Sequence, residues 1–197
     1  NSKIIFSDFS KGGGYARNLG VEQAKGKWII FADSDDYFSD NIKSILDRSY
    51  DVDADIIYLN TDSYDDKGQQ SYRHIRYSKL VLDFVNDKKN EDALRYYFTP
   101  PWGKIIKRDL ILDHKIKFDE IVSSNDVMFS LRTSFFAKKI AVDADIFYII
   151  TLSKGSVTQI ISKRHFNSKF KTAITANKFL IKIGKKKYQQ SVLYFLA

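Results

Sequence analysis

The chain has 197 residues, enough to bury one sizeable hydrophobic core, and its content of 44% hydrophobic and 15% aromatic residues indicates a globular protein. It contains no cysteine, which excludes disulfides and thiolate metal sites, and no apolar run of membrane-spanning length. Its formal net charge of +8 at pH 7 suits anionic partners such as nucleotide diphosphates, acidic lipid surfaces or nucleic acid.

The first part of the chain predicts a strand, a glycine loop, a helix and a second strand. Residues 2–7 have the pattern of a short strand, and residues 12–14, all glycine, predict a loop that can take positive φ or approach a ligand closely. Apolar residues recur at helical spacing over residues 15–25, and Gly26 stands at the expected C-cap. The uncharged run 28–32 predicts a strand buried on both faces, as in a parallel sheet. These segments together predict a βαβ unit with a right-handed crossover.

Three carboxylates, those of Asp33, Asp35 and Asp36, follow the second predicted strand. In parallel sheets, ligands bind beyond the carboxyl ends of the strands. Asp33 and Asp35 are two positions apart, so in an extended chain their side chains leave on the same side, roughly 7 Å apart at the backbone. They could supply two oxygen ligands to a hard cation, Mg²⁺ or Mn²⁺. The alternative is a solvated acidic turn or an Asp N-cap.

With these carboxylates, the first part of the chain resembles family 2 glycosyltransferases. The resemblance lies in residues 13–20, 24–27 and 31–37, in that order. That family has the glycosyltransferase A fold and uses nucleotide-diphosphate sugars. The resemblance implies that Asp35 holds the metal, that Asp33 shares it or faces the nucleotide ribose, and that Arg17 helps to bind the nucleotide. For Arg17 the alternative is a surface salt bridge.

The family places its first strands, with an acidic residue that reads the nucleotide base, before the point at which this chain starts. We therefore expect the chain to be a fragment that lacks the first half of its nucleotide-binding region. In such a fragment the strand at residues 3–7 would lie near an unprotected sheet edge, so the fragment is expected to self-associate into a homo-oligomer or to bind nucleotide poorly relative to the complete chain.

The middle of the chain alternates short helices and strands. Residues 40–47 predict a helix with one apolar face, residues 54–60 a strand, and residues 65–68 a hairpin turn. Residues 91–98 predict another helix that carries an aromatic cluster. The stretch 72–90 alternates basic and apolar residues and indicates no single element.

Residues 100–110 contain Trp102, Gly103 and Lys104 and resemble the family's tryptophan–small/polar–lysine segment at the edge of the acceptor site. The resemblance implies that Trp102 contacts the acceptor. The alternative is a tryptophan that anchors a strand in the core. Gly103 stands where the family often carries Asn, so a hydrogen bond is expected to be looser there.

Residues 123–129 carry the candidate general base. Ser123 or Ser124 is expected to cap a helix, whose apolar positions include Val127, Met128, Leu131 and Phe135. Asp126 then lies in the first turn, where the helix dipole favours an anion and no catalytic role is needed. The resemblance implies instead that Asp126 is the catalytic base of the family's Glu-Asp pair, with Asn125 in place of the usual Glu.

The last part of the chain predicts a strand that ends at residues 147–150 and a long helix over residues 163–196. Between them, residues 154–158 resemble the family's Gly-Ser-hydroxyl loop near the donor phosphates, although a plain turn explains them equally well. A basic run near the end of the helix is either a solvated face or a contact for acidic lipid head groups, and consists of Lys182, Lys185, Lys186 and Lys187.

The expected fold is α/β: a partial glycosyltransferase A, Rossmann-like mixed sheet with flanking helices and a helical C-terminal extension. Residues 1–60 would be the remaining part of the nucleotide-sugar-binding region, residues 61–160 the acceptor-side region of the same domain, and residues 161–197 the extension. The basic C-terminal region would contact the inner face of the plasma membrane from the cytoplasm.

The expected function is that of an inverting glycosyltransferase in surface polysaccharide or glycolipid synthesis. It would move a sugar from a nucleotide-diphosphate sugar to a hydroxyl of a glycan or lipid-linked acceptor. A divalent cation would neutralise the leaving diphosphate while Asp126 accepts the acceptor proton. One alternative is a non-catalytic remnant that binds nucleotide sugar or glycan. A nucleic-acid-binding module suits the charge but not the acidic cluster, and no nucleic-acid motif is present.

Overall fold

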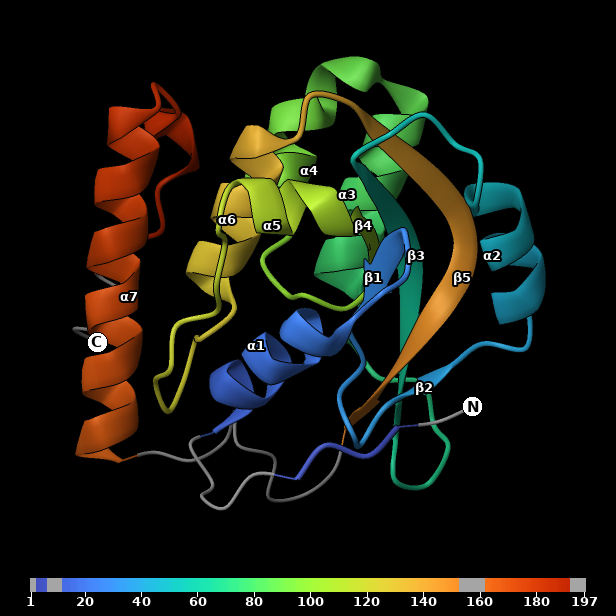
Figure 1. Cartoon of the computed structure of the whole chain (residues 1–197), viewed down its shortest axis with the longest axis horizontal. Coiled ribbons are helices and arrows are strands. Elements are labelled where there is room, and N and C mark those ends of the chain that lie inside the picture. Colours follow the sequence, from blue (N-terminus) through green and yellow to red (C-terminus); the bar gives the residue numbers. More distant parts are fainter. Residues whose placement is uncertain (1–2, 7–11, 153–161, 192–197) are drawn as a thin grey trace.

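The computed structural model describes residues 3–6, 12–152 and 162–191 (Figure 1). Five strands form one mixed sheet in the order β1-β4-β3-β5-β2. β3 and β5 pair in parallel, and the other pairings of the described sheet are antiparallel. The strands are β1 (Trp28–Ile30), β2 (Tyr37–Phe38), β3 (Ile56–Asp65), β4 (Lys104–Lys107) and β5 (Ile140–Leu152). The predicted mixed α/β sheet is confirmed.

β3 and the long, curved β5 form the centre of the sheet (Figure 1). The first eight residues of β3 are all buried, which fits a strand covered on both faces. Helix α3 packs on both central strands and α2 packs on β5. The described α-helices are α1 (Gly13–Gln23), α2 (Ile42–Ser49), α3 (Ile75–Asn86), α4 (Glu91–Tyr97), α5 (Arg108–Asp113), α6 (Val127–Phe136) and α7 (Lys163–Lys182).

The prediction of a strand at residues 2–7 is wrong for residues 3–6, the part of it that the structure describes. Residues 3–6 belong to no strand, and Ile4 and Phe6 are 75% and 87% exposed. β1 is an edge strand of the described sheet, antiparallel to β4, rather than the parallel strand buried on both faces that was predicted. An apolar run is consistent with burial but does not reveal which strand pairs with it. The described residues therefore contain no βαβ unit at this point.

Helix α1 begins within the glycine run rather than after it. Gly12 has φ +87° and precedes the helix, whereas Gly13 and Gly14 are helical. The helix ends at Gln23 with an extended Ala24, so the C-cap predicted at Gly26 is wrong. Gly14 is required by packing, because a Cβ there would lie 2.2 Å from the carbonyl oxygen of Asp119.

Replacing Gly14 with Ala is expected to lower the free energy of unfolding by about 1–3 kcal/mol, since an added methyl must displace backbone. Urea denaturation would measure the change. Gly20→Ala, on the same helix, is the matched control: its Cβ would meet nothing within 4 Å. That variant should gain up to about 1 kcal/mol from helix propensity. Equal midpoints for the two variants would contradict the packing argument.

The other elements follow the sequence with shifts that have local causes. The helix predicted at residues 40–47 is α2, the strand at 54–60 is the first part of β3, and the helix at 91–98 is α4. At the predicted hairpin turn, the Gly68 N–H donates to the Asp65 carbonyl at 3.0 Å. The undecided stretch 72–90 contains α3 and a 3₁₀ helix at Lys88–Asn90. α5, which directly follows β4, was not predicted.

Helix α7 lies along one side of the molecule (Figure 1). It packs through a second, smaller apolar cluster formed by Tyr96, Val127, Met128, Leu131, Ala176 and Leu180. The prediction of a helix through residue 196 is wrong, because α7 ends at Lys182. Gly184 has φ +74°, and the N–H groups of Gly184 and Lys185 donate to the carbonyls of Ile181 and Leu180, as in a Schellman motif. A 3₁₀ helix, Lys186–Tyr188, follows, and residues 192–196 lie outside the described part.

Within the described residues, no helix has both the length and the apolar character needed to cross a membrane.

Candidate active site

The predicted acidic cluster forms a compact group in the turn between β1 and β2. One carboxylate oxygen from each of Asp33, Asp35 and Asp36 lies within 4.8 Å of the other two. The turn is closed by the Asp36 N–H, which donates to the Asp33 carbonyl at 3.2 Å. Closely spaced carboxylate oxygens are the donor set that Mg²⁺ and Mn²⁺ prefer, so these residues fit a hard divalent cation.

Asp36 fastens this turn to β5. The Tyr148 hydroxyl donates to one Asp36 oxygen at 2.8 Å, and the Thr151 N–H donates to the other at 2.8 Å. The same Tyr148 hydroxyl accepts the Asp33 N–H at 2.8 Å. Burial raises the pKa of Asp36, and the hydrogen bonds from Thr151 and Tyr148 act against that rise. Since both of its oxygens are engaged, Asp36 positions the turn and leaves the exposed Asp35 as the freest carboxylate of the three.

Arg17, on α1, joins the acidic turn to the segment before α6. Its guanidinium forms an ion pair with Asp33 and also donates to the Asn125 side-chain oxygen at 2.9 Å. The guanidinium carbon lies 5.5 Å from the centre of the Phe118 ring. Both members of the ion pair are partly buried, so it differs from an ordinary surface salt bridge.

Asp126 lies in a cleft of about 560 Å³ together with three of the other predicted site residues, Arg17, Asp33 and Trp102. We call this the active-site cleft. Its wall also includes Arg73, Arg76, Ser124, Asn125 and Lys169. The structure therefore brings four of the five predicted residues to one space, with Asp35 in the adjoining acidic turn.

Asp126 itself is the N-cap residue of α6, so the predicted cap at Ser123 or Ser124 is wrong. Ser124 has φ +60°, a left-handed conformation, and the helix begins only after Asp126. The Asp126 side chain makes no capping hydrogen bond. Burial raises the pKa of its carboxyl group, against the opposing effects of its own backbone N–H and of the positive charges of Arg17 and Lys104. This carboxylate is thus a stronger base than an ordinary Asp.

Trp102 is packed in the core and is also placed at the cleft, while its contact with an acceptor stays a prediction. Its side chain is only 5% exposed, and its ring stacks on Tyr148 with a centroid distance of 5.7 Å. It nevertheless forms part of the cleft wall. The next residue, Gly103, has φ +66°, and a Cβ there would lie 3.0 Å from both Phe98 and Thr61. Glycine takes this backbone conformation without strain, and a larger residue here would also have to displace the Phe98 and Thr61 side chains.

Lys104 was not singled out from the sequence. It is fully buried, and its ammonium nitrogen donates to the Phe98 carbonyl at 2.6 Å and to the Ser130 hydroxyl at 3.2 Å. Burial lowers its pKa to about 7, while the Asp126 carboxylate acts in the opposite direction. Lys104 therefore ties β4 to the loop that carries Trp102 and to the first turns of α6. The only signal in the sequence was its place in the tryptophan–small/polar–lysine segment. The loop predicted at residues 154–158 lies outside the described residues.

The sequence of the chain is similar to those of known proteins. The model of the family described as glycosyl transferase family 2 matches residues 1–114. The putative glycosyltransferase EpsH of Bacillus subtilis is 25% identical over 175 residues, which cover 84% of this chain and 49% of EpsH. The glycosyltransferase GlyG of Streptococcus pneumoniae is 24% identical over 163 residues, covering 79% of this chain and 54% of GlyG.

Among solved structures, residues 1–349 of Staphylococcus aureus TarS in complex with UDP-GlcNAc superpose with a TM-score of 0.65 at 20% identity. The match covers 95% of this chain and 52% of that one, and it shows a shared fold. TarS is a poly(ribitol-phosphate) β-N-acetylglucosaminyltransferase. The chain spans about half the length of the first two relatives.

Proposed function

Because the chain belongs to glycosyl transferase family 2, we propose that it is part of an inverting enzyme that moves a sugar from a nucleotide-diphosphate sugar to a hydroxyl acceptor. The observation that carries this proposal is the convergence of Arg17, Asp33, Trp102 and Asp126 on one cleft, beside the acidic turn. The complex of TarS with UDP-GlcNAc supports a UDP-sugar as the first donor to test. Relatives named for succinoglycan and poly(ribitol-phosphate) synthesis support a role in surface polysaccharide or glycolipid synthesis.

On the donor side, Asp35 would hold Mn²⁺ or Mg²⁺, with Asp33 sharing the cation or facing the ribose. When bound, the cation supplies positive charge to the diphosphate as the bond to the anomeric carbon breaks. Asp36 keeps the turn in place through Tyr148 and Thr151. Arg17 adds a guanidinium at the boundary between this turn and the cleft, where it can bind nucleotide oxygens.

On the acceptor side, Asp126 would take the proton of the attacking hydroxyl. The acceptor oxygen forms a bond to the anomeric carbon, the bond from that carbon to the diphosphate breaks, and the proton passes to the Asp126 carboxylate. A single displacement of this kind inverts the anomeric configuration. The raised pKa of Asp126 favours proton transfer to it, and the positive charges of Arg17 and Lys104 help to keep the Asp126 carboxylate ionised.

The donor side is tested by titrating the intact protein with UDP-GlcNAc in a calorimeter, with Mn²⁺ and with a chelator. Wild type should bind more tightly with the metal. Asp35→Asn should weaken metal-dependent binding by about 10–100-fold, as the loss of one charge-assisted contact would. Asp66→Asn removes the same charge from the exposed hairpin turn and should bind as wild type does. Binding that is unchanged by the chelator or by Asp35→Asn would overturn the metal assignment.

We also propose a cytoplasmic location with peripheral contact at the inner face of the plasma membrane. Residues 162–191 contain no Asp or Glu and many lysines, which supports attraction to anionic lipid head groups. Of the basic run, Lys185 is paired with Asp92 at 2.5 Å, so the contact would rest on Lys182, Lys186 and Lys187. Self-association into a homo-oligomer remains a prediction, with exposed Ile4 and Phe6 as apolar contacts.

A further inference from the structure

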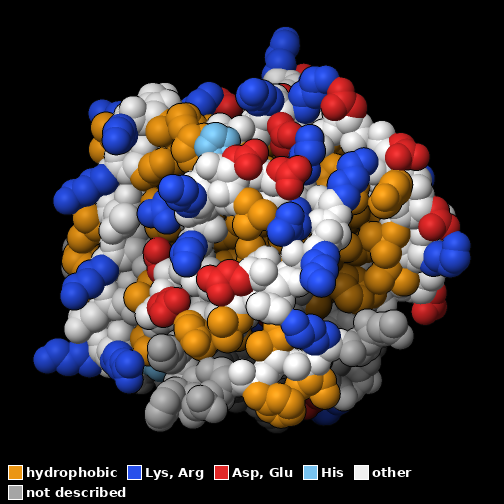
Figure 2. Space-filling model, in the orientation of Figure 1, with side chains coloured by type: hydrophobic (Ala, Val, Ile, Leu, Met, Phe, Trp, Pro, Cys, Tyr) orange, Lys and Arg blue, Asp and Glu red, His pale blue; other side chains and the backbone are white. Residues whose placement is uncertain are grey.

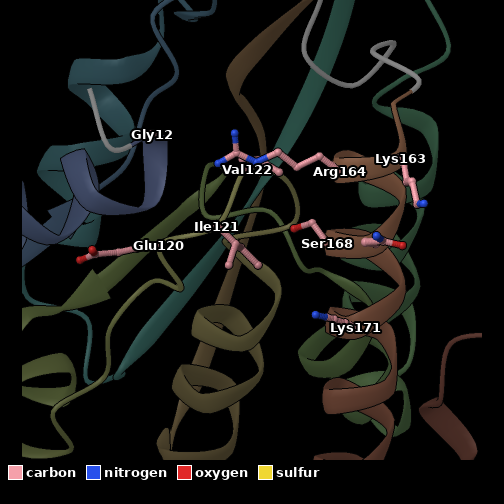
Figure 3. Close-up of a pocket in the computed structure, with 9 residues that line it drawn as sticks. Gly12, Glu120, Ile121, Val122, Lys163, Arg164, Ser168 and Lys171 are labelled. Atoms are coloured by element: carbon pink, nitrogen blue, oxygen red, sulfur yellow. The ribbon is translucent and has the colours of Figure 1, made fainter. Parts of the chain in front are cut away.

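A second cleft, of about 900 Å³, lies between α7 and the segment before α6. One wall is formed by Gly12 and residues 120–122, and the other by the first turns of α7 (Figure 3). The two walls are joined where the Ser168 hydroxyl donates to the Ser123 carbonyl at 2.8 Å. We call this cleft the α7 groove.

The α7 groove is positively charged. Arg164 and Lys171 are exposed and extend from α7 toward residues 120–122, whereas Lys163 points away from that segment (Figure 3). Within the described residues, neither Arg164 nor Lys171 forms an ion pair with a carboxylate. The one acidic residue among those that line the groove in the described part, Glu120, points away from α7 and accepts a hydrogen bond from Asn18 at 3.4 Å. Figure 2 shows Lys and Arg side chains along the margin where α7 lies.

The α7 groove adjoins the active-site cleft. Val122 lines both, and Lys169, the neighbour of Ser168, lines the active-site cleft together with Arg73 and Arg76. Positive side chains therefore extend from the surroundings of Asp126 outward along α7. Arg17 differs from them, because Asp33 already balances its charge.

We propose that the acceptor is an anionic chain that carries phosphate groups, and that one of these phosphates binds in the α7 groove while the acceptor hydroxyl faces Asp126. This inference rests on the proposed function and names the class of acceptor. Guanidinium and ammonium groups that lack carboxylate partners are suited to phosphate oxygens. Because Arg164 and Lys171 are exposed, the contact is screened by salt, so binding weakens as ionic strength rises.

The test uses a synthetic glycerol phosphate hexamer as the probe and an uncharged hexasaccharide as its neutral counterpart. Binding to the intact protein is measured by calorimetry at low and at physiological salt. Wild type should bind the phosphate probe and not the neutral one. Replacing both cations, Arg164→Gln with Lys171→Gln, should weaken phosphate binding by roughly tenfold, as the loss of two exposed charge-assisted contacts would. Lys178→Gln is the matched control, since Lys178 is exposed on α7 and lines neither cleft.

Vesicles that contain anionic phospholipid distinguish the source of the phosphate. If the double variant loses binding to the hexamer, the groove binds a soluble phosphodiester chain. If it loses only vesicle binding, the groove binds a lipid head group and the proposal of a phosphate-bearing acceptor chain is overturned. Unchanged binding of both probes, or equal losses in Lys178→Gln, would overturn the proposal. UDP-GlcNAc binding is measured on the same samples, so failure of the proposed function is detected separately from failure of the groove.

Discussion

Replacing Asp126 with Asn is expected to lower the rate of sugar transfer by roughly 10²–10⁴, the usual contribution of a general base. Asn matches the shape of Asp but cannot accept the acceptor proton. Binding of UDP-GlcNAc should stay close to that of wild type, because the acidic turn is untouched. The measurement is the turnover number at saturating donor, together with the calorimetric dissociation constant of the donor.

The structure separates a catalytic role of Asp126 from a role in capping α6. The Asp126 side chain forms no capping hydrogen bond to α6, so the variant should lose little stability. Asp119→Asn is the matched control: it removes a partly buried carboxylate from the same segment, and Asp119 does not line the active-site cleft. Wild-type turnover in folded Asp126→Asn, or an equal loss in Asp119→Asn, would refute the assignment of the base.

The fold is expected to become more stable as the pH rises from about 7 toward 9.5, and the cause is Lys104. Burial lowers the pKa of Lys104 from 10.5 to about 7 in the folded chain. The unfolded chain therefore binds more protons than the folded chain between these values, so its free energy of unfolding increases with pH in this window. A shift of this size corresponds to roughly 4–5 kcal/mol between pH 7 and 10.5, of which about 3 kcal/mol is expected between pH 7 and 9.5.

Urea denaturation of wild type and Lys104→Met at several pH values measures this effect. Methionine fills similar space without a charge, so the stability of wild type relative to the variant should rise steadily from pH 7 to 9.5. Lys107→Met, at the less buried end of the same strand, should retain the pH dependence of wild type. Parallel curves for wild type and Lys104→Met would show that the Lys104 ammonium is not desolvated. The window ends below 10 because tyrosines begin to ionise there in the unfolded chain.

Helices and turns that depend on residues close together in the chain could be predicted from the sequence. α2 and α4 have an apolar face that is visible in a few residues, and the turn at Asp65 and Gly68 has its own residue chemistry. The acidic turn and the order of Trp102 and Asp126 along the chain were recognisable through the family resemblance. The predictions that were wrong concern features that depend on residues far away in the sequence. β1 pairs with β4, and Gly14, at the start of α1, lies against the Asp119 carbonyl.

The candidate site shows the same division. Asp33 and Asp35 could be named because they are neighbours in the chain. The contact of Arg17 with Asn125 joins residues that are 108 positions apart, and only the fold brings them together. Lys104 is the clearest case, since a lysine is ordinarily exposed. Its burial requires β4, the Phe98 carbonyl and the Ser130 hydroxyl to meet at one point.

Arg17 also makes the two sides of the active-site cleft interdependent. It holds Asp33 with one part of its guanidinium and Asn125, the neighbour of Asp126, with another. Any cation that takes Asp33 as a ligand must compete with a positive charge already in place. Displacing the guanidinium from Asp33 would also alter its hydrogen bond to Asn125, because the same group makes both contacts. A single side chain thus connects the acidic turn to the segment that carries Asp126, so a substitution on one side is expected to disturb the other.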